Sequence, residues 1–339
     1  MLAHSLHKVN TTKLKSLVVS ILLMVALLAL VGCNTPFGAP TTISQTSGLP
    51  TLHHLNWGAS YYEHALYSPD GRWIAVLAGS DFSKSHLEVL SPDGHTQYDL
   101  SNWNCGLWEF FDYAWLPDGR LSCIRADSTD GVYMLCVGSY PFHTCDRKAL
   151  SSDLRGEAKG AVWTTDGAFL LLAAYAEANG KVDIRLCVTK PDGAVTQVLL
   201  LGNSVSLPQW RPHTTTLSYL LGNDLVLSST SWAKSQLTLG KPQIIVGGQE
   251  ADVSRYAWSP SGHWIAARVW SPGDDKIALI NADNPAQTVN VVSYSTAQWL
   301  TADPVWSPDG KTLIVFTVSE DQPYAINIAD YLHSKGLEV

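Results

Sequence analysis

Acidic residues recur a few positions before six regularly spaced aromatic residues, a pattern that could hold a cation or a basic peptide. Three positions before the aromatics stand His64, Asp112, Gly160, Leu207, Arg255 and Asp303. If the fold gathers these positions at one opening, its rim, here named the acidic mouth, carries Glu63, His64, Glu109, Asp112, Glu157, Asp252, Arg255 and Asp303. The alternative is a series of solvated loop edges, where acidic residues are ordinary.

The same loops contain aromatic residues that suit the recognition of an amine. They are expected to be exposed, and they are Trp57, Tyr61, Trp103 and Trp108. An aromatic face attracts a cation, and a nearby carboxylate pairs with it. The sequence therefore favours a basic peptide or an amine-bearing ligand at the acidic mouth. A closed metal site is disfavoured, because Gly160, Leu207 and Arg255 belong to the same ring of positions.

The chain contains none of the sequence motifs that mark common catalytic sites. It has no G-x-S-x-G nucleophile elbow, no P-loop, no G-x-G-x-x-G and no H-E-x-x-H. We therefore assign no catalytic, cofactor-binding or metal-binding residue. The sequence favours a protein that is not an enzyme and that needs no cofactor.

Five cysteines follow Cys33, and their spacing allows disulfide bonds. The stretch "CVGSYPFHTC" predicts a hairpin that joins Cys136 to Cys145, and pairing of Cys123 with Cys136 is the alternative. Cys187 occupies the same repeat position as Cys136 in the next unit, too far away to pair with it. We expect Cys187 to be a buried free thiol, while the odd count leaves an intermolecular bond open.

A recurring motif explains why the aromatic residues are so evenly spaced. The chain writes "VWSPDGKTLI" at Val305–Ile314 and close variants before it, with the aromatic at Tyr67, Trp115, Trp163, Trp210, Trp258 and Trp306. The interval between successive aromatics is nearly constant along the whole series. A constant period of about 48 residues indicates a repeat architecture. The aromatics are expected to pack between neighbouring units rather than to form a ligand site.

Each period predicts four antiparallel strands. Pro sets φ for the first corner of a turn, Asp accepts local N–H bonds and Gly supplies a positive φ, so "S-P-D-G" predicts a type I hairpin turn. Runs rich in β-branched and apolar residues follow each turn, as in "RWIAVLAG" and "KTLIVFTV". Blades of this kind bury both faces when they surround an axis, which predicts an all-β protein with six four-stranded blades, a β-propeller.

The motif resembles the WD40-like repeat of the TolB type, also called PD40. This repeat is shared with propellers of the prolyl oligopeptidase and tricorn protease families, and the resemblance covers about Thr51–Val339. It implies the propeller fold and protein partners in the cell envelope. The fourth copy, "QWRPHTTTLSY", lacks Asp-Gly, so we expect an irregular turn in a blade that the spacing retains.

The last period is short of strands and predicts how the ring closes. The segment from Trp306 to Val339 is shorter than one period, and Thr51–Leu66 supplies approximately the missing length. "TLHHLNW" also resembles "TQYDLSNW", the expected fourth strand of the first unit. We therefore expect about Leu52–Asn56 to be the outer strand of the last blade.

The first residues read as a lipoprotein signal. Lys8, Lys13 and Lys15 precede the apolar run "LVVSILLMVALLALVGC", and "LVGC" at Leu30–Cys33 resembles the bacterial lipobox. The resemblance implies cleavage before Cys33 and a lipid on its thiol, with 1–32 as the signal peptide and 33–50 as a Thr-, Ser- and Pro-rich linker. An uncleaved anchor helix is the alternative.

Charge and topology together indicate an extracytoplasmic binding module. Loss of residues 1–32 leaves 19 basic against 30 acidic residues, a net charge of −11 that disfavours nucleic acid as a partner. We expect a propeller, lipid-anchored to the bacterial cell membrane, that binds or scaffolds envelope proteins or peptides without catalysis. The alternative is a propeller enzyme with a metal-assisted channel site, of the lactonase or sugar dehydrogenase type. The sequence names neither the partner nor the membrane leaflet nor the oligomeric state.

Overall fold

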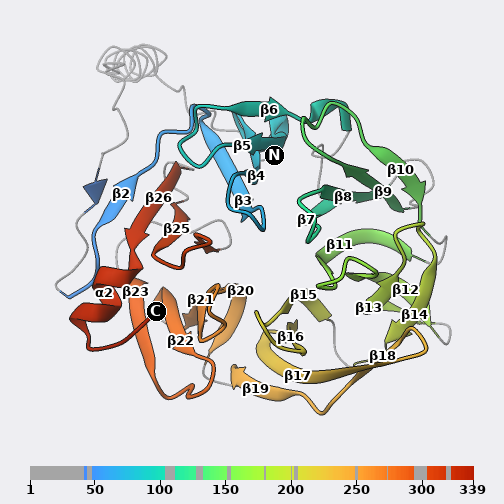
Figure 1. Cartoon of the computed structure of the whole chain (residues 1–339). Coiled ribbons are helices and arrows are strands. Elements are labelled where there is room, and N and C mark those ends of the chain that lie inside the picture. The colour runs from blue at the N-terminus through green and yellow to red at the C-terminus, as the bar shows by residue number, and fades with distance from the viewer. Residues whose placement is uncertain are drawn as a thin grey trace, which may run out of the picture. The chain divides into compact units, whose positions relative to one another are not determined.

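The structure is a computed structural model, and its strands form six antiparallel sheets around a central axis (Figure 1). It describes residues 42–43, 48–103, 111–126, 133–150, 154–178, 181–199, 201, 205–248, 251–272, 274–293, 304–317 and 322–339. Each sheet is one blade, and the strand that ends at the motif aromatic lies nearest the axis (Figure 1). The predicted all-β class with six blades is confirmed.

The first three blades have four strands each, in chain order from the axis outward. Blade 1 contains β3 (Tyr61–Tyr67), β4 (Ile74–Gly79), β5 (His86–Leu90) and β6 (Gln97–Asp99). Blade 2 contains β7 (Phe111–Trp115), β8 (Leu121–Ala126), β9 (Tyr133–Gly138) and β10 (Asp146–Ala149). Blade 3 contains β11 (Leu154–Trp163), β12 (Leu170–Ala178), β13 (Lys181–Thr189) and β14 (Val195–Leu199). Two short 3₁₀ helices, η1 (Phe82–Lys84) and η2 (Ser101–Trp103), lie in the connections.

The remaining blades depart from the four-strand pattern at two places. Blade 4 contains β15 (Val205–Trp210), β16 (Thr216–Leu221), the long β17 (Asp224–Ala233), β18 (Gln236–Leu239) and β19 (Gln243–Val246). Here β19 pairs with the first half of β17 and β18 with its second half. Blade 5 contains β20 (Asp252–Trp258), β21 (Trp264–Ser271), β22 (Asp274–Asn281) and β23 (Thr288–Ser293). Blade 6 contains β24 (Val305–Trp306), β25 (Thr312–Thr317), β26 (Gln322–Asn327), β2 (Leu52–His54) and β1 (Thr42–Ile43).

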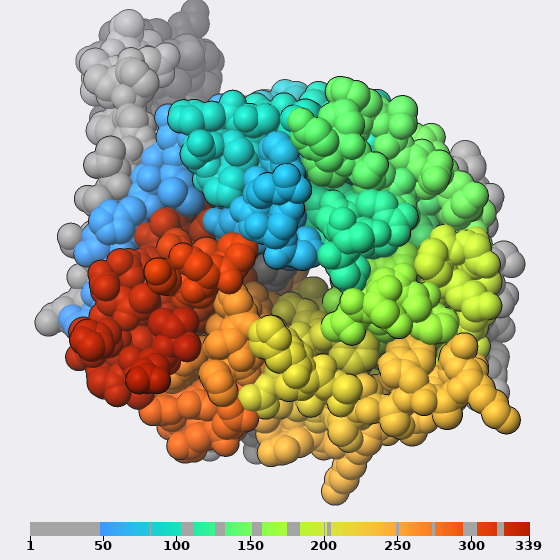
Figure 2. Space-filling view, viewed as in Figure 1, coloured from blue at the N-terminus to red at the C-terminus, as the bar shows by residue number. Residues whose placement is uncertain are grey.

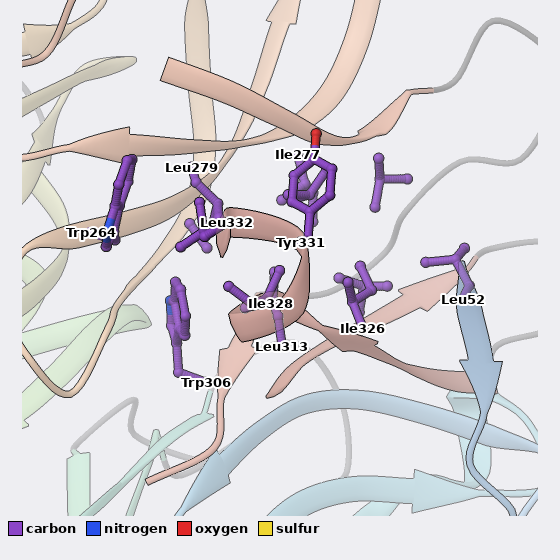
Figure 3. Close-up of a cluster of buried hydrophobic side chains, with 14 of the residues drawn as sticks. Leu52, Trp264, Ile277, Leu279, Trp306, Leu313, Ile326, Ile328, Tyr331 and Leu332 are labelled. Atoms are coloured by element: carbon purple, nitrogen blue, oxygen red, sulfur yellow. The ribbon is translucent and has the colours of Figure 1, made fainter. Parts of the chain in front are cut away.

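The N-terminal strand β2 completes the blade that the C-terminal strands begin. His53 pairs with Ala325 and His54 with Tyr324, and the Leu55 N–H donates to the Pro323 carbonyl at 2.8 Å. Next to this pairing, helix α2 (Ile328–Ser334) packs Ile328 and Leu332 into a core that blades 5 and 6 share (Figure 3). None of the helices in the described ranges is long and apolar enough to cross a membrane.

The motif turns are held by the hydrogen bonds that their residue types allow. In the first copy the Ser68 hydroxyl donates to Asp70 at 2.6 Å and accepts the Trp73 N–H at 3.0 Å, while Asp70 accepts the Arg72 N–H. Gly71 follows with φ +70°. These bonds, chiefly the one from Ser68, lower the pKa of Asp70 to about 2. We name the side of the ring with these turns the turn face; the acidic mouth is expected on the opposite side.

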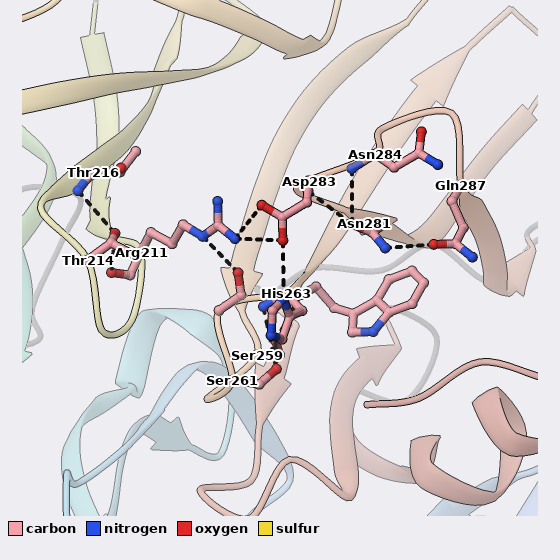
Figure 4. A network of polar contacts seen from close by, with 12 residues as sticks. Arg211, Thr214, Thr216, Ser259, Ser261, His263, Asn281, Asp283, Asn284 and Gln287 are labelled. Carbon is pink, nitrogen blue, oxygen red and sulfur yellow. Dashed lines mark hydrogen bonds and ion pairs between the residues drawn. The ribbon is translucent and has the colours of Figure 1, made fainter.

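The fourth turn is irregular, as its sequence predicts. Without Asp-Gly, the left-handed residue is His213 (φ 61°), one position earlier than the glycine of the other copies. Arg211 stands where four of the other five copies have Ser or Thr, and it reaches into blade 5 instead (Figure 4). It donates to the Gly262 carbonyl at 2.9 Å and to both carboxylate oxygens of Asp283 at 2.7 and 2.9 Å. The cross-blade ion pair lowers the pKa of Asp283 and takes the place of the local turn bonds.

Motif tryptophans join each blade to the one before it. Four of them donate their indole N–H to the preceding blade. Trp115 donates to the Leu66 carbonyl and Trp163 to the Ser122 hydroxyl. Trp258 donates to the Ser218 hydroxyl and Trp306 to the Ala257 carbonyl. The donor–acceptor distances are 2.8–3.2 Å. Packing and hydrogen bonding therefore act together at these blade interfaces.

Trp210 is the exception among the motif tryptophans. Its Nε1 is buried and has no hydrogen-bond partner among the described residues. The position that holds Ser122 in blade 2 and Ser218 in blade 4 is Leu171 in blade 3, as the strand register shows. The interface between blades 3 and 4 thus lacks the hydroxyl acceptor found at two other interfaces.

Candidate functional site

The central channel of the ring holds a cavity of about 510 Å³. Figure 2 shows the channel as an opening at the centre of the ring. Its wall combines aliphatic side chains such as Leu66 and Val162 with five motif aromatics, Tyr67, Trp115, Trp210, Trp258 and Trp306. Prolines also line it: Pro69, Pro212, Pro260 and Pro308 belong to the turns that follow the inner strands, and Pro208 and Pro304 precede the motif aromatics of blades 4 and 6. The wall of the cavity is therefore mostly apolar.

Two members of the predicted acidic mouth, His64 and Asp112, lie in the channel wall. The inner strands begin before these positions, so both residues lie within a strand rather than in the loop that precedes it. His64 is the fourth residue of β3, where the register with β4 shifts between Glu63 and Leu66, and it has φ 53°. A bulge changes the direction in which a side chain points. Here it accompanies the placement of His64 in the channel wall.

Glu63 lies beside His64 in a network of opposite charge. Its carboxylate is 3.3 Å from His64 Nε2 and accepts a hydrogen bond from the Tyr61 hydroxyl. Burial would raise the pKa of Glu63, but the hydrogen bond and charge of His64, with smaller contributions from Tyr61 and Arg255, outweigh it and lower the pKa. The carboxylate is therefore ionised at neutral pH.

The structure describes only some of the other members of the acidic mouth, and these do not line the cavity. Asp252 and Arg255 are partly buried on β20 and do not line it. Glu157 lies in β11, but its side chain is outside the described part, as are all of Glu109 and Asp303. Within the described ranges, no three His, Cys, Asp or Glu side chains lie close enough together to hold a metal ion.

The inner strands of blades 3 and 4 approach each other closely in the channel wall. Gly160 has φ 131°, and a Cβ at this position would lie 2.6 Å from both Cα and N of Leu207. Leu207 itself is left-handed with φ 49°, at a register shift in β15. At these two ring positions, Gly160 and Leu207, the residues allow the backbones of β11 and β15 to come close together.

The prediction of exposed aromatics beside the acids is wrong for the three residues that the structure describes. Trp57 and Trp103 are 3% exposed and Tyr61 is 7% exposed. Trp57 packs edge-on against Phe316 of blade 6, and the Trp103 indole donates to the Phe142 carbonyl at 3.0 Å. Their partners come from other repeats, so the local sequence could not indicate the burial. Trp108 lies outside the described residues.

The cysteines fall into two groups. Cys136 and Cys145 form a disulfide between β9 and the start of β10, with their Cα atoms 5.5 Å apart. Cys123 is also disulfide-bonded, while Cys105 lies outside the described residues. The expected free thiol is confirmed, since Cys187 is unpaired and buried, and burial raises its pKa to about 12. Such a thiol is inert at neutral pH.

The residues that line the channel on the turn face were missed by sequence reasoning. Turn geometry explains the proline of "S-P-D-G" on its own, without reference to its distance from the axis. A signal was present, because a proline stands two positions after the motif aromatic in five of the six copies, directly after an inner strand and therefore near the axis. The same holds for the motif aromatics, which line the channel as well as pack between blades.

Comparisons with known proteins identify the fold. No protein-family model matches the sequence, and no curated protein sequence is significantly similar to it. Solved structures do match. A gluconolactonase, XC5397 from Xanthomonas campestris, is similar with a TM-score of 0.57 and 12% identity, over 85% of this chain and 94% of that one. The chain is a six-bladed β-propeller.

Two further structures show how broadly this propeller fold is used. An oligogalacturonate lyase in complex with manganese matches with a TM-score of 0.52 and 13% identity, over 85% of this chain and 81% of the lyase. The Cps50 (Swd1) β-propeller domain of Myceliophteria thermophila matches with a TM-score of 0.51 and 10% identity. The match covers 84% of this chain and 98% of that domain. The similar structures thus include two enzymes and the propeller domain of Cps50 (Swd1), and the likeness extends to the fold alone.

Proposed function

We propose that the protein is an extracytoplasmic lipoprotein of the cell envelope, with a TolB-like propeller that binds a protein or peptide partner without catalysis. The N-terminal apolar run and the "LVGC" stretch support the membrane tether. The single observation that carries the binding role is the cavity in the central channel, whose wall combines apolar and aromatic side chains with the carboxylate of Asp112. A peptide segment with a basic side chain fits this combination.

Charge favours a basic segment over an acidic one. The chain without residues 1–32 has a net charge of −11, so it attracts cations over a long range. Within the site, Asp112 lies in the wall and the ionised Glu63 lies next to His64. Among the motif aromatics of the wall, Tyr67, Trp115 and Trp210 are partly exposed, and an exposed aromatic face attracts a cation. Affinity would come from the apolar wall, and the choice of basic over acidic peptides from the carboxylates.

Reversal of charge in the channel is expected to weaken binding of a basic peptide. The probe is a fluorescent peptide of alternating Lys and Leu, compared with the same peptide carrying Glu for Lys. In anisotropy titrations at low salt, Asp112→Lys should weaken binding of the Lys peptide about tenfold or more, and added salt should shrink the difference. The matched control is Asp146→Lys, because Asp146 is exposed on the outer strand β10. Equal binding of both peptides, or an equal loss in the control, would show that the channel does not select for basic segments.

The lipid tether is tested separately at the N-terminus. Intact-mass and peptide analysis of the protein made in a bacterial host should find a mature chain that begins at acylated Cys33. Cys33→Ser should remove the acyl groups and release the protein from the membrane fraction. A chain that keeps Met1, or that is cut elsewhere and carries no lipid, would exclude lipoprotein processing.

A further inference from the structure

A second cavity of about 400 Å³ lies between blades 3 and 4 on the turn face. One side is formed by the turn between β11 and β12, and the other by the irregular fourth turn and the end of β17. The only residue that it shares with the described lining of the central channel is Trp210. We name it the blade 3–4 groove.

Aromatic rings form the floor of the blade 3–4 groove. The rings of Phe169 and Trp232 stack with centroids 4.9 Å apart and planes at 19°. The Trp232 side chain remains 37% exposed, which is unusual for a residue that carries so much apolar surface. Because Phe169 stacks on Trp232, the indole is held in one orientation. It is a rigid, flat surface at the edge of a cavity.

Hydroxyl groups surround this surface. Thr165, Thr215, Ser231 and Ser235 line the groove and are exposed, and their hydroxyls make no hydrogen bond to any other described residue. Each hydroxyl can donate and accept a hydrogen bond. The groove therefore offers several adaptable partners to a ligand that itself carries many hydroxyls.

One carboxylate adds a stronger acceptor to the groove. Asp166 uses Oδ1 to accept from the Thr164 hydroxyl at 2.6 Å and from the Ala168 N–H at 3.0 Å. Its Oδ2 has no partner among the described residues. These bonds, chiefly the one from Thr164, lower the pKa of Asp166, so the group stays ionised at neutral pH. The described lining includes no cationic side chain.

A hairpin specific to the fourth repeat builds the groove. β17 continues past β16 and turns back into β18, with left-handed Lys234 and Ser235 at the tip. The hairpin is fixed to blade 3, because the Gln197 side-chain amide bonds both the N–H and the carbonyl of Leu237 at 2.8 Å. The groove is thus formed in advance of any ligand, which lowers the entropic cost of binding.

We infer that the blade 3–4 groove binds a ring of a neutral saccharide, with an apolar sugar face on Trp232 and sugar hydroxyls on Asp166 and the free Thr and Ser hydroxyls. The flat aromatic surface matches the C–H face of a pyranose, and the polar rim matches its edge. An acidic saccharide or a phosphate is disfavoured by Asp166 and by the overall negative charge. The inference is independent of the proposed binding role of the channel.

The test is calorimetric titration of the protein, without residues 1–33, with defined ligands. Cellotetraose and chitotetraose are the neutral saccharides, tetragalacturonate is the acidic one, and decaproline is a peptide that could also stack on an exposed indole. At least one neutral saccharide should bind, and Trp232→Ala should weaken it about tenfold or more. Trp270→Ala is the matched control, since Trp270 is 46% exposed on blade 5 and away from the groove.

A second pair of variants separates recognition from folding. Asp166→Asn should weaken saccharide binding several-fold, whereas Asp309→Asn, at the same turn position in blade 6, should leave it unchanged. Both should change the melting temperature equally, because both turns use the same bonds. Binding should also survive Asp112→Lys in the channel. The inference is overturned if no neutral saccharide binds, if tetragalacturonate or decaproline binds better, or if Trp232→Ala has no effect.

Discussion

Removal of Thr51–Asn56 should lower the melting temperature of the propeller by roughly 8 °C or more, because this segment closes the ring. Leu52 is buried in the core that blades 5 and 6 share, and its loss costs about 1.5–3 kcal/mol. The deletion also removes the pairing of β2 with β26 and the bond from Leu55 to Pro323. β26 would then be an unpaired edge, which favours association between molecules.

The control for this deletion is the removal of residues 34–47, which keeps β2 and takes away only the short strand β1 from the outer edge. This variant should melt within about 2 °C of the parent, since β1 is joined to β2 by only two residue pairs, Thr42 with His53 and Ile43 with Leu52. Differential scanning calorimetry on both variants gives the comparison. If the deletion of residues 51–56 has the same melting temperature as the control, the closing strand β2 does not stabilise the propeller.

The repeat could be read from sequence because its signals are local. Ser68, Asp70 and Gly71 bond one another within a single turn, so their types alone predict the geometry. The even spacing of the motif aromatics then gives the number of blades. The shortfall in the last period led us to expect an outer strand at Leu52–Asn56, and in the structure β2 pairs with β26. Features determined by neighbours in sequence are accessible in this way.

The candidate sites depend on neighbours from other repeats, and the sequence indicated them only in part. The periodicity located His64 and Asp112, which line the channel. It gave no sign that Trp57, near the start of the ring, packs on Phe316 in the last blade. It also gave no sign that Trp210 lacks the kind of acceptor that Trp163 has. Such contacts arise only when blades meet side by side.

The irregular fourth repeat is the clearest example of this limit. Its missing Asp-Gly was visible in the sequence, and the irregular turn followed from it. What replaces the turn bonds, the pair of Arg211 with Asp283 in blade 5, could not be read from "QWRPHTTTLSY" (Figure 4). The blade 3–4 groove, which lies beside the same turn, was missed for the same reason.

Gly160→Ala should destabilise the protein by roughly 3–5 kcal/mol, far more than most single substitutions, because it combines two costs. The backbone of Gly160 has φ 131°, a conformation that favours glycine. In addition, the new methyl group would lie 2.6 Å from the Leu207 backbone and 2.7 Å from Pro208 Cδ. The neighbouring strand cannot easily move away, since Leu207 is itself left-handed and Pro208 has a fixed φ.

Gly119→Ala separates these two costs. Gly119 also has a positive φ, 85°, but a Cβ there would have no atom within 4 Å. Its replacement should therefore cost only the backbone term, about 1–2 kcal/mol. Urea unfolding of both variants gives the difference, which measures how closely β11 approaches β15. Equal losses would mean that the two strands lie farther apart than the structure has them. A clearly larger loss of unfolding free energy for Gly160→Ala would show that the close approach of Leu207 is what requires glycine at position 160.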